Sequence, residues 1–578
     1  MTCLKLTSGL AIATATWAAS LPGRYFELLE AGSRQVESRL SAGAGATLET
    51  LEQTPGWRHF GYSVLAPAVL YARRHPANPR YHDKAMLALA TRIGDLLASE
   101  NERGKFTPRL DSDWDTYIWL EAYRLLQDEL GAERRERWKR AILENAALLA
   151  APAAERVDFP WYNSPYISTS PNHYAQWAEL LYLAGRTFDK PDWVKLGAAI
   201  LHRFVSEEQT TDGYWGEHSR SGPTTNYDYV TLSAIGVYWE HAKDPAALEA
   251  LRRSTAFHTH FTYPDGTPVE TINDRNRYGP VEPWAQFAFT NFPEGRRYAE
   301  FLTGFFSAAK LSMDVLGRLA QDALYYHEGP AAPIPQDRQN YVYRMSIPAG
   351  IRKTGPWVVS FSGIVDTQAA NNQFYLDRQS NLSVFHSRLG LIVNGANSKR
   401  QVELATFRER IAGVTYHLPL SSKLDMSDQR DRLSVAFNSF FSDLYVPPPS
   451  EREIALRFVI SGKGRAPEEA FTTLQLVLTP GETLQTAAGK NVTIGQERLE
   501  LEPEAIGAWI RHHGWTIYVD PAARMVWPVH PFNPYSNAPE EGLAHAVAAL
   551  SVPIRLQAKP GQPVRPNEQE IKFRLVTE

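Results

Sequence analysis

The chain has 578 residues, more than one hydrophobic core usually serves, so two domains are expected. Hydrophobic residues make up 43% and charged residues 21%, which is ordinary for a globular protein and argues against a disordered or membrane-embedded chain. The formal net charge is −4, with 60 basic and 64 acidic residues intermixed, so no nucleic-acid partner is expected. The single cysteine, Cys3, excludes intramolecular disulfides and cysteine-based metal sites.

The first predicted element is residues 1–20, which resemble a weak secretory signal. They contain one Lys, a mildly apolar run and small residues around Ala18 and Ala19. The run is too short and too rich in Thr and Ala to span a bilayer, and no other segment is a candidate span. The expected location is therefore periplasmic or secreted, with a cytoplasmic start as the alternative.

From residue 21 to about 328 the dominant pattern is helical. Stretches such as YHDKAMLALATRIGDLLASE and HYAQWAELLYLAGRTF place apolar residues at i, i+3, i+4 and i+7. Connections rich in Gly, Pro and Asp, such as AGRTFDKPD, separate them. No fixed repeat is visible, which disfavours a solenoid of repeats. We predict antiparallel helical hairpins arranged as an (α/α) toroid, with the starts of the inner helices lining a cleft.

The pattern changes to strands over residues 329–578. GPAAPIPQDRQ is a Pro-rich linker without periodicity. After it, short runs rich in Val, Ile, Phe, Tyr and Thr alternate with turns, as in WVVSFSGIV and TTLQLVLTPG. This predicts an antiparallel β-sandwich. The expected fold class is therefore α+β multidomain, with an N-terminal toroid of helical hairpins and a C-terminal sandwich.

The first candidate site residues are the adjacent Asn172 and His173, at the predicted start of a helix in SPNHYAQWAELL. An amide and an imidazole at an inner-helix start would face the cleft. The structural alternative is that Asn172 caps the helix and His173 is an ordinary first-turn residue. The sequence leaves both interpretations open.

Tyr227 and Tyr229 follow after one further helical hairpin, in GPTTNYDYVTLSA. Residues two apart on a helix point about 200° apart, so only one of these tyrosines can face a given cleft. Either ring could equally be core. An amide, an imidazole and a phenol are together the groups needed to remove a proton beside a carboxylate and to protonate a leaving oxygen.

These motifs, with the toroid and sandwich, resemble the heparinase II/III and alginate lyase superfamily of polysaccharide lyases. The segment FTYPDGTPVETINDRN (261–276) also resembles a Pro-Asp-Gly turn and a short Asp-containing stretch near the end of that family's helical domain. The resemblance implies β-elimination at a uronic acid in an anionic polysaccharide, giving unsaturated uronate ends. It implies no required cofactor and leaves a structural divalent metal open.

The resemblance also implies a role for each candidate. Asn172 would neutralise the C5 carboxylate, and Tyr227 would be the general acid, and also the base in syn elimination. His173 would be the base for the opposite epimer or a partner of the tyrosine. The motif YDYVTLSA favours Tyr227 over Tyr229. The sandwich would contribute His386, although a lone His in a strand is more often structural.

Further residues are candidates for substrate binding because they are polar or aromatic and lie near predicted cleft loops. Each could instead be a core or solvated residue. They are Trp57, Arg58, His59 and Tyr62 in WRHFGYS, Glu217, His218 and Arg220 in the loop before the tyrosines, Arg275 in NDRNRY, and Arg388 beside the strand histidine. No metal site is predicted, since His258 with His260 and His512 with His513 lack completing ligands.

Two other functions remain open from the sequence. The first is a glycoside hydrolase on a helical toroid, using two of Asp111, Asp113, Asp115 and Glu217 as paired carboxylates. The second is a non-catalytic glycan-binding protein. The sequence does not distinguish among uronic polymers, between endo and exo action, or between syn and anti elimination, and it leaves the oligomeric state unknown.

Overall fold

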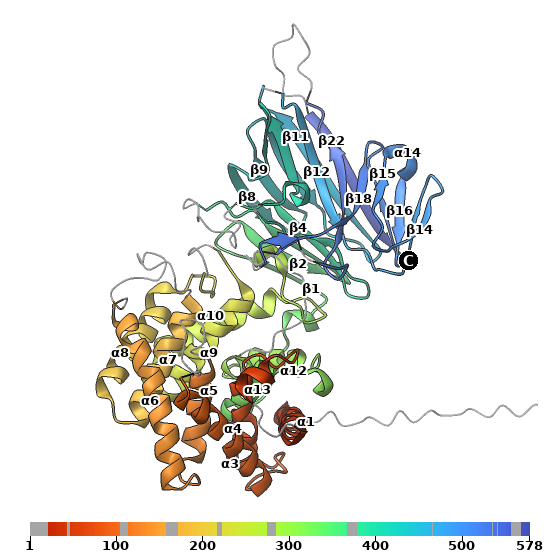
Figure 1. The fold of residues 1–578 in the computed structure, drawn as a ribbon. Coiled ribbons are helices and arrows are strands. Elements are labelled where there is room, and N and C mark those ends of the chain that lie inside the picture. Colours follow the sequence, from red (N-terminus) through yellow and green to blue (C-terminus); the bar gives the residue numbers. More distant parts are fainter. Residues whose placement is uncertain are drawn as a thin grey trace, which may run out of the picture.

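The computed structural model describes most of the chain. The described residues are 21–42, 47–104, 114–155, 157, 171–216, 222–273, 285–366, 378–398, 400–464, 466–533, 536–539, 541–556 and 568–578. Figure 1 shows helices in the first part of the chain and two large sheets in the second. The predicted fold class is confirmed.

The helical half is built from amphipathic helices whose apolar faces meet in one continuous core. In chain order the helices and short helical turns are α1 (Leu21–Ala42), α2 (Leu48–Glu52), η1 (Phe60–Val64), α3 (Leu65–Ala72), α4 (Lys84–Glu102), α5 (Trp114–Leu126), α6 (Ala132–Ala154), α7 (Pro171–Thr187), α8 (Pro191–Arg203), η3 (Phe204–Glu208), α9 (Thr225–Ala242), α10 (Pro245–His260), η4 (Glu270–Ile272), α11 (Gln286–Phe289), α12 (Pro293–Thr303), η5 (Ala308–Lys310) and α13 (Met313–Tyr325).

The helical half closes on itself, because the first helix packs against the last. Helices α1 and α13 are in contact, and the Tyr25 hydroxyl of α1 donates to the Gln286 side chain at 2.7 Å. Gly32 of α1 lies against Leu316 of α13, where a Cβ atom would come within 2.4 Å of the leucine side chain. Among the described residues, no helix combines the length and apolarity needed to cross a bilayer.

The second half consists of antiparallel strands. Preceded by the turn η6 (Pro335–Asp337), they are β1 (Asn340–Arg344), β2 (Ala349–Thr354), β3 (Trp357–Ser362), β4 (Asn381–His386), β5 (Gly390–Asn394), β6 (Phe407–Ile411), β7 (Val414–Tyr416), β8 (Ser421–Met426), β9 (Asp431–Ala436), β10 (Phe440–Val446), β11 (Glu453–Gly462), β12 (Glu469–Leu476), β13 (Thr483–Thr486), β14 (Asn491–Thr493), β15 (Leu499–Leu501), β16 (Trp509–His512), β17 (Trp515–Tyr518), β18 (Arg524–Val529), β19 (Phe532–Asn533), β20 (Ala538–Pro539), β21 (Val547–Pro553) and β22 (Glu568–Thr577). The turn η7 (Val402–Leu404) and the short helix α14 (Pro503–Ile506) interrupt them.

These strands form two large sheets that enclose an apolar core. Within the described residues the first sheet has eleven strands, ordered β1-β2-β3-β4-β5-β12-β21-β18-β15, with β6 paired to β12 and β7 paired to β6. The second has nine, ordered β14-β13-β16-β17-β22-β11-β10-β9-β8. Alternate residues point inward: Val359 and Phe361 of β3 share a core with Phe458 of β11.

The first sheet turns its outer face toward the helical half. Val358 of β3 and Phe385 of β4 form a separate apolar cluster with Phe257 and Tyr263 from the helical half. The Tyr263 and Phe385 rings stack with their centroids 4.6 Å apart. A hydrogen bond of 2.6 Å joins the Tyr263 hydroxyl to Ser383. This junction determines which strand residues can approach the helices.

Candidate functional site

Asn172 and His173 lie in the first turn of α7, which begins at Pro171. Asn172 is fully buried, and both polar atoms of its amide lack a hydrogen-bond partner in the part of the chain that the structure describes. The capping alternative is therefore wrong, because a capping side chain would accept from a backbone N–H. His173 is half-buried.

Gln176 continues the same buried face of α7, and sequence reasoning missed it. It lies four residues after Asn172, so the two side chains share one face of the helix. Gln176 is 1% exposed, and its amide oxygen and nitrogen also have no hydrogen-bond partner among the described residues. Buried amides are nearly always paired, so two unpaired ones in succession mark an unusual place. The i, i+4 spacing of two amides was the available signal.

The two tyrosines of α9 have different surroundings. Tyr229 is 2% exposed, and its ring stacks on His258 with the centroids 4.1 Å apart. Its hydroxyl shares a hydrogen bond of 2.8 Å with the Tyr298 hydroxyl, and burial raises the pKa of Tyr229 well above its ordinary value. Tyr227 is half-buried. Tyr229 is thus a core residue, whereas the Tyr227 side chain is partly exposed.

Helices α7 and α9 are in contact, and the contacts between their carboxyl-terminal halves indicate that they run parallel. Toward their carboxyl ends the rings of Tyr182 and Tyr238 lie 5.3 Å apart, and Arg186 donates to the His241 carbonyl oxygen at 2.5 Å. Because the helices rise equally per residue, their first turns lie at the same end of the helical half. The structure therefore brings Asn172 and His173 onto the helix beside that of Tyr227, as the sequence predicted.

The loop before η1 contributes His59 to this end. Burial, followed by the charge of Arg58, lowers the pKa of His59 to about 4, and His173 is among the groups that also lower it. His59 and His173 are thus within electrostatic reach of one another. Trp57 is partly buried and stacks on Phe60, whereas Arg58 is exposed.

Tyr62, the fourth candidate of that loop, lies in the core. It is fully buried, and its hydroxyl lies 3.3 Å from the Tyr117 hydroxyl. The Arg318 guanidinium packs over its ring at 5.4 Å. Burial raises the pKa of Tyr62 well above its ordinary value. A ring in this position supports the loop and does not present a face to a sugar.

The structure does not bring His386 to the starts of α7 and α9. Strand residues alternate between faces, and Ser383 and Phe385 of β4 face the helical half. His386 therefore points to the other face, where its ring lies 4.8 Å from that of Trp357. Its Nδ1 accepts from the Arg388 backbone N–H at 3.3 Å, and burial lowers its pKa. The prediction that His386 reaches the cleft is contradicted by this alternation.

Arg388 is likewise remote from the helices. It is exposed, and its Nη2 donates to the carbonyl oxygen of Glu578 at 2.7 Å. Both partners belong to the strand half of the chain. Arg388 therefore links the β4–β5 turn to Glu578.

Several candidates lie outside the described residues, so their predictions stand as made. They are Glu217, His218, Arg220, Arg275, Asp111 and Asp113. Of the carboxylates proposed for hydrolysis, the structure describes Asp115, which is 6% exposed in the first turn of α5. It lies against Gly61, where a Cβ atom would come within 2.9 Å of the Asp115 Cβ. Among the described residues, no three His, Cys, Asp or Glu side chains form a metal-binding group.

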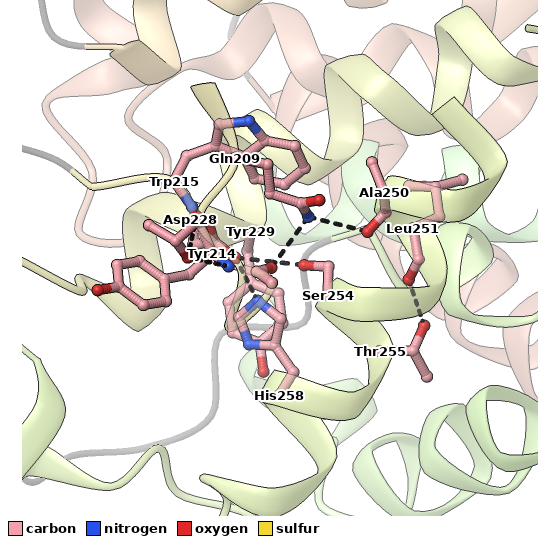
Figure 2. A network of polar contacts seen from close by, with 12 residues as sticks. Gln209, Tyr214, Trp215, Asp228, Tyr229, Ala250, Leu251, Ser254, Thr255 and His258 are labelled. Atoms are coloured by element: carbon pink, nitrogen blue, oxygen red, sulfur yellow. Dashed lines mark hydrogen bonds and ion pairs between the residues drawn. The ribbon is translucent and has the colours of Figure 1, made fainter. Parts of the chain in front are cut away.

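A fully paired polar network lies next to this end of α9 (Figure 2). The Asp228 carboxylate accepts from the Trp215 backbone N–H at 2.7 Å, from His258 Nε2 at 2.7 Å and from the Ser254 hydroxyl at 3.4 Å. Asp228 and His258 are each 1% exposed. We name Asp228, Trp215, Ser254 and His258 the Asp228 network. It anchors the helix turn that carries Tyr227, and His258 is thereby a structural residue.

No family model matches the chain, and no curated protein matches it. Among solved structures it is similar to a Streptomyces coelicolor A3 chondroitin AC lyase in complex with chondroitin sulphate, with 13% identity over 99% of this chain and 81% of that chain and a TM-score of 0.50. It is also similar to a heparan sulfate lyase from Pedobacter heparinus, with 12% identity over 90% of this chain and 76% of that chain and a TM-score of 0.48. The similarity to the chondroitin AC lyase extends over the fold that the sequence resemblance implied, helices followed by antiparallel sheets.

Proposed function

We propose that this protein is a polysaccharide lyase that cleaves a uronic-acid-containing glycan by β-elimination. The observation that carries the proposal is the buried, unpartnered amide of Asn172 beside His173, with Tyr227 in the first turn of the parallel neighbouring helix. Leaving a buried amide unpaired costs about 1–3 kcal/mol. Such a cost is consistent with an amide that hydrogen-bonds a substrate.

The proposed reaction needs three actions at one uronate. The Asn172 amide N–H donates to the C5 carboxylate and so stabilises the negative charge that develops when the C5 proton leaves. Tyr227 or His173 takes that proton, the C4–O4 bond breaks, and a C4–C5 double bond forms. Tyr227 returns a proton to the departing O4. Atoms and charges balance without a redox partner.

The surroundings support a neutral, hydrogen-bonding role for His59. Its lowered pKa of about 4 leaves the imidazole uncharged near neutral pH. A neutral ring can accept a hydrogen bond from a sugar hydroxyl without adding charge. The fold is shared with a chondroitin AC lyase solved with chondroitin sulphate, which supports an acidic polysaccharide as the substrate class.

The test is to incubate the purified protein with chondroitin sulphate, heparan sulphate, hyaluronan, alginate and glucuronan, and to record the absorbance of the unsaturated uronate. At least one polymer should develop this absorbance. Tyr227→Phe should lower the rate by roughly 10²- to 10⁴-fold, since it removes the acid–base group. Tyr229→Phe is the matched control and should keep most of the rate. New reducing ends without the absorbance would instead indicate a hydrolase.

A further inference from the structure

The outer face of the eleven-stranded sheet carries a cavity of about 540 Å³ over β12, β21 and β18, the strands that follow β5 in the sheet order. Its floor is apolar and comes from three neighbouring strands, with Phe471 on β12, Ala549 on β21 and Val526 on β18. The residues between these positions point into the sandwich core, as Ala470 and Leu550 do. The cavity is therefore a surface hollow, open to a ligand, and we name it the β12 hollow.

A guanidinium without a carboxylate partner lies in the wall of the β12 hollow. Arg408 of β6 packs over the Phe471 ring at 4.5 Å. Its Nη1 donates only weakly, to the Glu403 carbonyl oxygen at 3.4 Å and to the Thr473 hydroxyl at 3.3 Å. Within the described part of the chain, no carboxylate oxygen lies within ion-pairing distance of it. Burial lowers the pKa of Arg408, and the charges of Glu469 and Glu403 offset only part of that effect.

Two more arginines stand at the rim. Arg498 pairs with Glu500 at 2.5 Å, and Arg524 pairs with Glu502 at 3.2 Å. Both pairs are well exposed, and exposed pairs contribute little free energy, so either guanidinium can turn toward an anion. One carboxylate, that of Glu403, also lines the hollow. With Glu500 and Glu502 counted, three carboxylates lie near the three arginines, and Arg408 is the one of the three without an ion pair among the described residues.

The remaining wall is held rigidly and offers further polar groups. The side chain of Gln401 is 7% exposed; its Nε2 donates to the His530 carbonyl oxygen at 2.6 Å, and its Oε1 accepts from the Phe532 backbone N–H at 2.5 Å. His530 Nδ1 is buried and has no hydrogen-bond partner in the described residues. The Ser551 hydroxyl lines the hollow as well. An apolar floor with a few convergent polar groups is the usual form of a small-ligand site.

We propose that the β12 hollow binds an acidic sugar residue, with its carboxylate or sulfate on Arg408 and its ring on the floor formed by Val526, Ala549 and Phe471. The apolar floor suits the C–H face of a sugar, and the rim arginines suit further anions along an acidic chain. One part of this proposal rests on the proposed function: that the bound sugar belongs to a distal part of the polymer that is cleaved near Asn172. The binding of an acidic sugar in the β12 hollow does not depend on the proposed function.

The test uses the full-length protein with Tyr227→Phe, which prevents turnover, and isothermal titration calorimetry. The probes are a chondroitin sulphate hexasaccharide, an alginate hexasaccharide, an uncharged cello-oligosaccharide of equal length and inorganic sulfate. At least one acidic hexasaccharide should bind at two sites. Adding Arg408→Gln should weaken one of them at least tenfold, as expected from the loss of a charged hydrogen bond.

The matched control is Arg574→Gln. Arg574 also packs over an aromatic ring, that of Tyr518 at 3.9 Å, but it lies on the other sheet, outside the hollow. It should leave both sites intact. Circular dichroism melting reports whether Arg408→Gln is folded, and Val526→Glu, which adds a negative charge to the floor, should abolish the same site independently.

The outcomes separate the two proposals. If Arg408→Gln and Val526→Glu keep both sites, or if the uncharged oligosaccharide binds equally well, the β12 hollow is not an acidic-sugar site. If sulfate binds there and no hexasaccharide does, the glycan assignment is wrong. Without Tyr227→Phe, Arg408→Gln should raise KM for a long polymer and leave kcat unchanged. If acidic hexasaccharides bind in the β12 hollow but no polymer is cleaved, the proposed lyase function is wrong and the proposed sugar site still holds.

Discussion

Two buried polar regions lie on neighbouring helices of the helical half, and they differ in whether their polar atoms have hydrogen-bond partners. At the start of α7 the amides of Asn172 and Gln176 are buried without hydrogen-bond partners among the described residues. In the Asp228 network beside it, the Asp228 carboxylate accepts from three donors (Figure 2). Both regions cost free energy to bury, but only the network recovers it through hydrogen bonds. The comparison separates buried groups whose hydrogen bonds hold the fold from buried amides without such bonds, of which the proposed function assigns Asn172 to the substrate.

The largest expected effect is on stability, in the paired region. Asp228→Ala leaves the Trp215 N–H and the His258 ring N–H without their acceptor, so we expect the free energy of unfolding to fall by roughly 3–5 kcal/mol. Urea unfolding followed by circular dichroism measures it. Asp228→Asn, which keeps an acceptor oxygen, should lose less. A loss below about 1 kcal/mol for the Ala variant would show that the network is not structural.

The corresponding change in the unpaired region should affect activity instead. Asn172→Ala removes the group proposed to stabilise the developing charge, so kcat should fall roughly 10²- to 10³-fold. Because no hydrogen bond is lost within the described residues, the free energy of unfolding should not decrease by more than the packing of a few atoms requires. The unsaturated-uronate assay and urea unfolding are measured on one preparation. Lost stability with unchanged kcat would reverse the assignment.

The junction between the two halves supplies an intermediate case. Glu270 is fully buried; it accepts from the Gly395 backbone N–H at 2.9 Å and from the Tyr263 hydroxyl at 3.0 Å. Burial nevertheless raises its pKa to about 7, with Asp265 adding to the rise. Two hydrogen bonds are therefore not enough to offset the cost of burying the charged form of Glu270.

Because the folded-state pKa of Glu270 exceeds its ordinary value, its contribution to stability is complete below about pH 4.5 and is lost as pH rises through about 7. The rise in its pKa from 4.5 to about 7 corresponds to roughly 3 kcal/mol. Glu270→Gln should remove this part of the pH dependence, seen as the difference between wild type and variant in urea unfolding from pH 5 to 8. If the free energies of unfolding of wild type and Glu270→Gln change equally with pH, the raised pKa of Glu270 is contradicted. His59, whose pKa is lowered, changes stability in the opposite direction below pH 6.5 and cancels in the difference.

The smallest expected effect distinguishes the two tyrosines of α9. Tyr229→Phe removes the hydrogen bond to Tyr298, whose hydroxyl keeps its 2.7 Å contact with Thr262, so about 1 kcal/mol of stability should be lost. Tyr227→Phe should change stability by no more than about 0.5 kcal/mol. Thermal melting of both variants tests this. An equal loss in both would mean that the two rings share one environment.

Much of the fold could be predicted from the sequence, because periodicity is a local property. The 3.6-residue pattern of HYAQWAELLYLAGRTF corresponds to α7, and the short run rich in Val, Phe and Ile in WVVSFSGIV corresponds to β3. The change from helices to strands follows the Pro-rich linker. The pairing of Asn172 and His173 with a later tyrosine also followed from the order of the elements, since two parallel helices begin at the same end.

The remaining parts of the site depended on contacts between distant residues. His386 was predicted correctly to lie in a strand, but its direction depends on which face of β4 meets the helices, and Tyr263 decides that from far along the chain. Tyr62 reads as a loop aromatic, yet Tyr117 and Arg318 surround it. The pairing of Asp228 with His258 has no local signature at all.

The sequence by itself thus determined the elements, their order and a short set of candidate residues for the proposed chemistry. It could do so because side-chain periodicity and helix-start signals depend only on residues that are close together in the chain. Only the tertiary structure decided how each of those residues is buried and hydrogen-bonded. It paired Tyr229 within the core, turned His386 toward Trp357 and left the Asn172 amide without a partner among the described residues. Burial and hydrogen-bond pairing arise between segments far apart in the chain, so no local pattern encodes them.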